Sequence, residues 1–483
     1  MRRDWPRLWQ GCRSGLLFVA CALALGLAQG KDHSKVMKGP YASGPEVTKA
    51  CLECHEDEAH DFMKTVHWNW SALQKVPGKP DAKLGKANAV NNYCISLPGN
   101  EPRCTSCHAG YGWKDATFDF KKAENVDCLV CHDTTGTYKK LPAGAGHGAY
   151  VDTEFPPKSG KIVKALDLVA IAGKVGPTSR ATCGACHFFG GGGDHVKHGD
   201  LDSSMTAPSR DLDVHMDAKG ANMTCTDCHR TERHQIAGKA LSVSVGGSGQ
   251  TMGCTDCHAG KPHKQNRDLD RHTARVACQT CHVPSFAREL PTKVWWDWST
   301  AATAKPVTKD SYGLPLYDPA KGDFRWAKNV VPSYFWFNGS VDRVLIGDRI
   351  DPKGVVHLNK ARGSRDDQHA RITPFKMMQG KQPYDSVNNT MVTPHLFGKG
   401  GFWTTEDWAS AIASGMKAAG QPYSGQYGFV QTDMVWKVNH MVAPKKKALG
   451  CDDCHGAKGR MDWKALGYES DPKAAAAGPR AAK

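Results

Sequence analysis

One short pattern, Cys-x-x-Cys-His, occurs eight times in this chain of 483 residues. Two thiols at this spacing can add to the vinyl groups of a haem, and the adjacent imidazole can then bind the iron. Paired cysteines also hold zinc or form disulfides, but neither use requires a histidine after the second cysteine in every copy. The pattern therefore predicts eight covalently bound haem c groups, held by Cys51/Cys54/His55, Cys104/Cys107/His108, Cys128/Cys131/His132, Cys183/Cys186/His187, Cys225/Cys228/His229, Cys254/Cys257/His258, Cys278/Cys281/His282 and Cys451/Cys454/His455.

Each haem iron has a second axial position. Fourteen histidines lie outside the motifs, which suits bis-histidine ligation at most sites, the low-spin arrangement of electron transfer. For any single one of these histidines, a surface or structural role is the alternative. His147 and His395 are second-choice candidates for distal ligands, and His33 is expected to lie in a disordered N-terminal segment. Spacing and local sequence select seven distal ligands: His67, His198, His215, His234, His263, His272 and His440.

The elements that must position these ligands are expected to be short. Hydrophobic residues make up only 40% of the chain, with 50 glycines and 27 prolines, so haem macrocycles have to supply part of the core. We expect a mainly α multihaem cytochrome c fold, with helices and long loops wrapped around eight covalently attached haems. Folding should then depend on haem attachment.

Seven motifs precede residue 283, and the eighth follows after a long interval without a motif. The interval carries aromatic and β-branched runs that permit a few strands, and a helix is expected between Thr405 as N-cap and Gly420 as stop. The expected organisation is a signal peptide (1–30), a haem-rich region (31–290), an aromatic-rich covering lobe (291–450), an eighth haem segment (451–469) and a disordered tail (470–483).

The N-terminus has four arginines followed by an apolar run that ends in small residues. That order is typical of a secretory signal peptide, and the run is short for a membrane span, so we expect an exported, periplasmic protein that is not integral to a membrane. The formal charge of +15 falls to about +4 once the signal segment leaves and each ferric haem contributes about −1. Nucleic-acid binding is therefore not expected, and the lysines are better explained as partners of propionates and of an anionic substrate.

Cys94 is the one cysteine left over after the motifs and the signal segment, so it has no partner for an intramolecular disulfide. A Pro98-Gly99 turn separates it from Cys104, which allows it to fold back over that haem. An inert buried thiol is the alternative.

Longer passages resemble the octahaem tetrathionate reductase family, which is similar to hydroxylamine oxidoreductase and the pentahaem nitrite reductases. The resemblance covers roughly residues 45–465. It is carried by CISLPGNEPRCTSCHAGYGW at 94–113, NVDCLVCHDTTGTYKK at 125–140, CGACHFFGGGGDHVKHGDLD at 183–202, VACQTCHVPSFAR at 276–288, PFKMMQGKQPYD at 374–385 and NHMVAPKKKALGCDDCHG at 439–456.

The resemblance implies seven bis-histidine haems and one active-site haem, the second, held by its motif histidine and a lysine. Transferred by motif, that lysine is Lys197, and Asp194, Cys94 and Asn91 line the pocket, with Asn92 competing for the last position. Lysine binds iron only as the neutral amine, so its pKa must fall well below about 10.4. The glycines at 190–193 would let the backbone approach a haem face.

The function implied is reduction of tetrathionate, nitrite or hydroxylamine at this haem, with electrons from a periplasmic or membrane-bound redox protein. A six-coordinate iron offers no vacant position, so substrate is expected to displace Lys197 or to react beside the ring. One alternative is a non-catalytic electron carrier with eight bis-histidine irons. Another is oxidation of hydroxylamine, which needs a tyrosine cross-linked to haem, and Tyr111 keeps that alternative open.

Overall fold

The structure is a computed structural model that describes residues 32–73, 83–238, 253–258 and 261–476. The expected signal peptide lies outside these ranges, as do residues 477–483 of the expected tail. The first part of the tail is folded, because a short helix, α13 (Pro472–Ala476), follows Asp471. The Asp471 carboxylate accepts a hydrogen bond from His455 at 2.7 Å, so this part of the tail supports the eighth motif.

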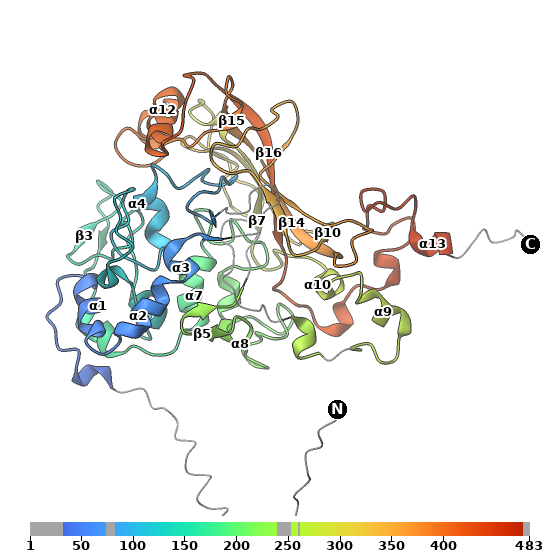
Figure 1. The fold of residues 1–483 in the computed structure, drawn as a ribbon, viewed down its shortest axis with the longest axis horizontal. Helices are drawn as coiled ribbons and strands as arrows, with labels where there is room; N and C mark the ends of the chain where they lie inside the picture. The colour runs from blue at the N-terminus through green and yellow to red at the C-terminus, as the bar shows by residue number, and fades with distance from the viewer. Residues whose placement is uncertain (1–31, 74–82, 239–252, 259–260, 477–483) are drawn as a thin grey trace, which may run out of the picture.

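The haem-binding half consists of short helices joined by long loops (Figure 1). Its helices are α1 (Gly44–Leu52), α2 (Glu56–Met63), α3 (Val66–Asn69), α4 (Glu101–Cys104), α5 (Leu129–His132), α6 (Leu168–Gly173), α7 (Arg180–His187), α8 (Cys225–Cys228), α9 (Arg267–His272) and α10 (Cys278–His282). Hairpins of two strands each lie among the loops: β1 (Ala72–Leu73) with β2 (Lys83–Leu84), β3 (Thr153–Glu154) with β4 (Ile162–Val163), and β5 (Thr231–Glu232) with β6 (Gln235–Ile236).

Most motifs form a single helical turn. The histidine N–H donates to the carbonyl of the first cysteine in the first, third, fifth, sixth and eighth motifs, at 2.8–3.0 Å. Residues three and four apart share a face of a helix, so this turn directs both sulfurs and the imidazole to one side. The spacing of the motif is therefore the spacing of one helical face.

The second half is built on a twisted, mostly antiparallel sheet. Its long central strands β14 (Arg371–Asp385) and β16 (Tyr427–Lys437) pair from Phe375 with Lys437 to Asp385 with Tyr427. Among the described residues the sheet has eight strands, completed by β7 (Thr292–Asp297), β8 (Tyr317–Asp318), β9 (Gly322–Ala327), β10 (Ser333–Phe337), β12 (Val356–His357) and β15 (Thr390–Met391), while β11 (Val341–Arg343) pairs with β13 (Asn359–Ala361) outside it.

The expectation of a mainly α protein missed this sheet. Helix accounts for 24% and strand for 20% of the structure. The aromatic and β-branched runs of the second half fit a pleated, half-buried surface, which is why they form strands. The expected helix is present as α12 (Trp408–Ala418), but its N-cap is Asp407, which accepts from the N–H groups of Ala409 and Ser410. Thr405 instead ends the preceding short helix, α11 (Phe402–Thr405).

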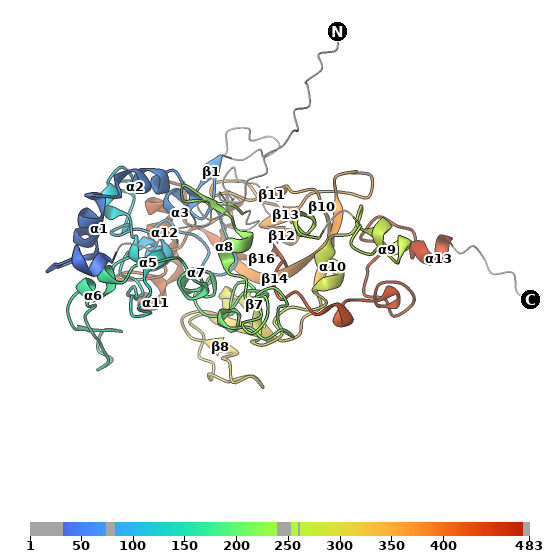
Figure 2. The same ribbon diagram turned by 90° about the horizontal axis from the view of Figure 1, so that it is seen from below.

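The sheet lies between two groups of haem motifs (Figures 1 and 2). Helices α1 to α8 lie on one side, and α9, α10 and α13 lie on the other, so the eighth motif is beside the seventh. Hydrogen bonds join these two motifs: Leu449 N–H donates to Cys281 at 3.0 Å, and Arg460 donates to Pro284 at 2.7 Å.

The largest hydrophobic core joins the two halves of the chain. It packs Tyr93, Ile95 and Val196 of the haem-binding half against residues of the sheet such as Trp296 and Met378. The sheet therefore supports the loops that carry Cys94 and Lys197. No helix among the described residues is both long and apolar enough to cross a membrane.

Candidate haem cavity and active site

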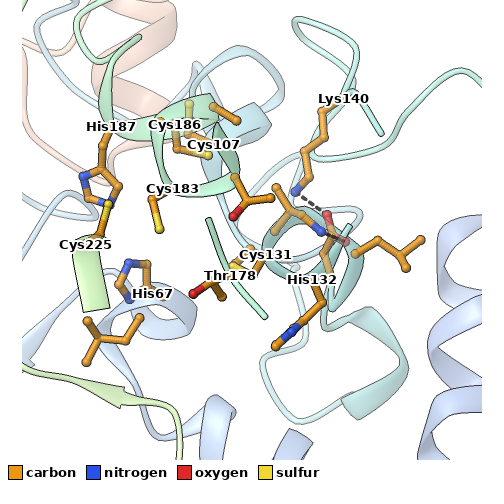
Figure 3. A pocket seen from close by; sticks show the side chains of 18 of the residues that line it. His67, Cys107, Cys131, His132, Lys140, Thr178, Cys183, Cys186, His187 and Cys225 are labelled. Atoms are coloured by element: carbon orange, nitrogen blue, oxygen red, sulfur yellow. Dashed lines mark hydrogen bonds and ion pairs between the residues drawn. The ribbon is translucent and has the colours of Figure 1, made fainter. Parts of the chain in front are cut away.

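A single large cavity connects motif residues that are far apart in the sequence. Its volume is about 2750 Å³, and motif cysteines of the first five motifs line it. Figure 3 shows the sulfurs of several motifs facing this space, with His67 and His187 on the same side of it. A cavity of this kind, bounded by paired thiols and imidazoles, suits several adjacent haems.

Seven motif histidines each face a second histidine at nearly the same distance. Metal–imidazole bonds of about 2.0–2.1 Å place two trans imidazole centroids about 6 Å apart, which is the separation seen here. The pairs are His33–His55 at 6.3 Å, His67–His187 at 6.1 Å, His132–His234 at 6.4 Å, His215–His258 at 6.1 Å, His229–His440 at 6.4 Å, His263–His282 at 6.2 Å and His272–His455 at 6.3 Å. The donor set and its spacing therefore fit seven bis-histidine haems.

The structure brings six of the seven expected distal histidines into such pairs. The exception is His198, which lines the cavity but faces no motif histidine in any of these pairs. The place opposite His55 is taken by His33, which the sequence interpretation assigned to a disordered start. A short 3-10 turn (His33–Lys35), capped by Asp32, holds it. In the sequence, Asp32 followed by Ser34 could have indicated that a capped turn orders His33.

The two histidines kept as alternative ligands, His147 and His395, face no motif histidine in these pairs. His147 stacks on Tyr111, and His395 donates to the Phe397 carbonyl at 2.5 Å.

Hydrogen bonds at Nδ1 orient many of these rings. His132 donates to Gly176 at 2.8 Å, His229 to Ala237 at 2.8 Å and His272 to Asp268 at 2.6 Å, each at a backbone carbonyl. His440 and His455 donate instead to the carboxylates of Asp200 and Asp471. Such bonds fix the tautomer and leave Nε2 free for iron, which is the usual second layer of support around a metal ligand.

His108 of the second motif is arranged differently. Its N–H donates to Thr105 rather than to Cys104, and its backbone is extended, with φ −71° and ψ 136°. The ring is fully buried among aromatic side chains, and its Nε2 donates to the Trp68 carbonyl at 2.7 Å. Burial lowers the pKa of His108 to about 3, so the ring is neutral. The histidine expected to bind the second iron is thus directed away from the cavity, although Cys104 and Cys107 line it.

Lys197 lines the same cavity and is the amine expected at the second haem. It follows the glycine loop, where a Cβ on Gly190 or Gly191 would lie 3.1 Å from the lysine side chain. Glycine is therefore needed for the loop to pack on this lysine. Burial lowers the pKa of Lys197 to about 7, and the positive charges of Lys86 and Arg343 act in the same direction. The neutral amine that can bind iron is accordingly well populated at neutral pH.

Cys94 and Asn91 also line the cavity, on a loop held by the asparagine. The Asn91 carboxamide oxygen accepts from the N–H groups of Tyr93 at 2.9 Å and Cys94 at 3.1 Å. Asn92, the competing residue, is buried and donates to Met378 on the sheet. Cys94 lies beside the second motif, since its sulfur interacts electrostatically with that of Cys104.

Asp194 does not have the position expected for it. Its carboxylate accepts from the N–H and hydroxyl of Ser203, and it does not line the cavity. It therefore fixes the end of the glycine loop, because a side chain committed to a neighbouring turn is not directed at a substrate.

Basic residues surround Cys94. Burial raises the pKa of its thiol, and the positive charges of Arg103, Lys293, Lys86 and Lys321 oppose that rise. Arg103 and Cys94 line the cavity together. An anion entering here would meet a positive potential in a site of low dielectric constant.

Contacts between cysteines of different motifs give the order of the haem sites in space. The thiols lie close enough to shift each other's pKa in four pairs: Cys51 and Cys128, Cys107 and Cys186, Cys183 and Cys225, and Cys254 and Cys278. Electrostatic contacts add Cys131 with Cys183, Cys228 with Cys257 and Cys281 with Cys454. The motifs therefore follow the series one, three, four, five, six, seven, eight, and motif two joins at motif four.

Three family models match parts of the chain: Cytochrome c bacterial over residues 293–458, Cytochrome c7 and related cytochrome c over 209–286, and Cytochrome c554 and c-prime over 50–133. An uncharacterized protein of Archaeoglobus fulgidus is 27% identical over 268 residues, which are 46% of this chain and 89% of that protein. A crystal structure of octaheme cytochrome c from Shewanella oneidensis is 50% identical, covers 92% of this chain and 98% of its own, and superposes with a TM-score of 0.83. Cytochrome c models thus match three separate stretches of the chain, and half of the residues agree with the octaheme cytochrome over nearly the full length of both chains. This chain therefore belongs to the octahaem c-type cytochromes, redox proteins with covalently bound haem.

Proposed function

We propose that the chain is an exported octahaem reductase, in which seven bis-histidine haems supply electrons to an eighth, bound by Lys197, where a small oxyanion is reduced. One observation carries the proposal: seven motif histidines face a second histidine, whereas His108 is directed into an aromatic enclosure and Lys197 lines the cavity near its motif. A protein that only carries electrons would not need one haem site with a different ligand from the other seven.

Lys197 would then be the side chain that holds the second iron. Because the Trp68 carbonyl holds His108, this chain would supply one ligand to that iron rather than the two expected from the sequence. A substrate could then reach the iron without displacing the lysine, whereas the family resemblance led us to expect either displacement of Lys197 or reaction beside the ring.

The residues around this site favour an anion. Arg103 and Lys86 carry positive charge toward the loop of Cys94, and Lys293 lies buried beyond it. Tetrathionate and nitrite are anionic, and both match this charge. We propose tetrathionate as the first substrate to test, with nitrite and hydroxylamine as the next.

Two alternatives from the sequence have less support. Eight bis-histidine irons would need a distal partner for His108, whose Nε2 is already bonded to Trp68. A tyrosine cross-link at the second haem was left open for Tyr111, but its hydroxyl donates to Asp127 at 2.7 Å, and the residue does not line the cavity.

The first experiment measures turnover of the purified holoprotein with reduced viologen as electron donor. Tetrathionate, nitrite and hydroxylamine are supplied in separate assays, and the Lys197→Met variant is the control. We expect turnover of at least one substrate by the wild type and loss of that turnover in the variant. Eight bis-histidine spectra, without turnover of any of the three, would establish the electron carrier instead.

A further inference from the structure

Lys376 is a lysine whose side chain has almost no access to solvent. It lies on β14, is 1% exposed, and reaches the segment that carries Lys197. Its Nζ donates to the Lys197 carbonyl at 2.8 Å, to the Val196 carbonyl at 3.0 Å and to the Thr292 hydroxyl at 2.5 Å. Lysine is almost never fully buried without partners, so this arrangement needs an explanation.

The three contacts use every donor of an ammonium group. Two of the partners are carbonyls, which only accept. The Thr292 hydroxyl donates its own proton to the His195 carbonyl at 2.7 Å, so it accepts from Lys376. Three acceptors match the three N–H bonds of an ammonium group, so the Lys376 side chain is held at three points.

A second side chain holds the same carbonyl. The Tyr93 hydroxyl donates to the Lys197 carbonyl at 3.0 Å, so both lone pairs of that oxygen are used. Tyr93 belongs to the loop of Cys94, and Asn91 fixes its N–H. The Lys197 carbonyl is thus the point at which the sheet and the Cys94 loop meet.

The segment held in this way has no regular structure of its own. Residues 195–198 lie outside any helix or strand, and His195 has φ 53°, a left-handed conformation that strains a non-glycine residue. The lysine side chain adds several rotatable bonds, so its amine can miss the iron unless the backbone below it is fixed. Lys376, Thr292 and Tyr93 provide that fixation.

We propose that Lys376 is a positioning residue for the active-site haem: together with Thr292 and Tyr93, it fixes the backbone of residues 195–198 so that Lys197 presents its amine to the iron. This inference rests on the proposed ligation by Lys197. It assigns a role to the PFKMMQGKQPYD passage, which the haem sites leave unexplained.

The test uses holoprotein variants with all eight haems confirmed by mass, studied by electron paramagnetic resonance and magnetic circular dichroism at one pH. Lys376→Met keeps the length of the side chain and removes its hydrogen bonds. We expect the signal of the Lys197-bound haem to fall by at least half in favour of a species that lacks lysine ligation, with the seven bis-histidine signals unchanged. Thr292→Val should give an intermediate loss, and Thr292→Ser, which keeps the hydroxyl, should match the wild type.

Lys197→Met, measured in parallel, separates the two proposals. If it leaves every spectrum unchanged, ligation by Lys197 is wrong, and the proposed function fails with it. If it removes the signal while Lys376→Met leaves that signal at its wild-type intensity, only the positioning role is overturned. A lower thermal midpoint with an intact lysine signal would likewise show a merely structural role. If Lys376→Met does not mature, Thr292→Val and Thr292→Ser are compared instead. Equal intensities of the Lys197-bound haem signal in these two variants would overturn the proposal.

Discussion

At the scale of single residues, the backbone at one position separates the second motif from the others. His108 has the same sequence context as the other motif histidines, but its extended backbone takes the imidazole off the helical face. The Trp68 carbonyl then gives Nε2 a partner, which a buried polar atom requires. A metal ligand is therefore decided by the local backbone as much as by the residue type.

Replacing Lys197 by methionine should change one haem of the eight. The variant loses the amine that we propose binds the second iron, so that haem should lose this ligand and take an external one. We expect the catalytic efficiency with the reducible substrate to fall about tenfold or more. Electron paramagnetic resonance checks the ligation, and Lys86→Met serves as a control that alters the nearby charge without removing the ligand. An unchanged haem spectrum in the Lys197 variant would contradict the assignment.

His33 and His198 offer a direct comparison between the structure and the sequence. His33 faces His55 at 6.3 Å, whereas the sequence favoured His198 as a ligand. We therefore expect His33→Ala to convert the first haem from low-spin to high-spin, because its distal imidazole is lost. His198→Ala should keep all seven bis-histidine signals. The reverse result, with His198 required and His33 dispensable, would show that the pairing at the first motif is wrong.

At the scale of elements, the sequence predicts what depends on neighbours along the chain and misses what depends on distant ones. The motif turns other than the second follow from local spacing, and the spacing or local context of six distal histidines was enough to select them. The register of β14 with β16 joins residues about 50 positions apart, so no local pattern specified it. His33 and the orientation of His108 depend likewise on tertiary contacts, with His55 and with Trp68.

The turn after β14 depends on one buried carboxylate. Asp385 accepts from the N–H groups of Val387 at 3.0 Å, Asn388 at 2.9 Å and Ser424 at 2.8 Å, and also from the Ser424 hydroxyl. Asp385→Asn places an amide donor among these donors, so we expect the free energy of unfolding to fall by about 1–3 kcal/mol in urea titrations at pH 7. Asp351→Asn is the matched control, because Asp351 accepts from Lys353 in an exposed turn.

The pH dependence of this difference is a separate check. The backbone and Ser424 hydrogen bonds lower the pKa of Asp385, against the effect of its burial. A depressed carboxyl pKa stabilises the fold above the unfolded value of about 3.9, and the contribution is lost as the pH falls through the folded pKa. The wild type should therefore lose its advantage over Asp385→Asn only in acid, below about pH 4. A difference that vanished between pH 6 and 8 would assign the effect to another group.

At the scale of the whole molecule, the cavity determines how the protein folds. A volume of about 2750 Å³ lined mostly by apolar atoms is far larger than the voids that protein interiors tolerate. The first five motifs contribute to its lining, so haem attachment supplies the contacts that these segments would otherwise lack. Separate haem sites are then joined through one shared core rather than through independent domains.

The polypeptide without haem should consequently remain unfolded. When the chain is produced in cells that lack the haem attachment machinery, we expect little regular circular dichroism and rapid proteolysis, because short helices such as α1 and α5 cannot persist without tertiary packing. The same chain produced with that machinery should gain about 5 kDa, the mass of eight haem groups, and become resistant to protease. Hydrogen exchange at the paired strands β14 and β16 of the haem-free chain tests whether the second half also needs haem to fold. Protection of these strands would show that the second half folds by itself and that only the first half depends on haem.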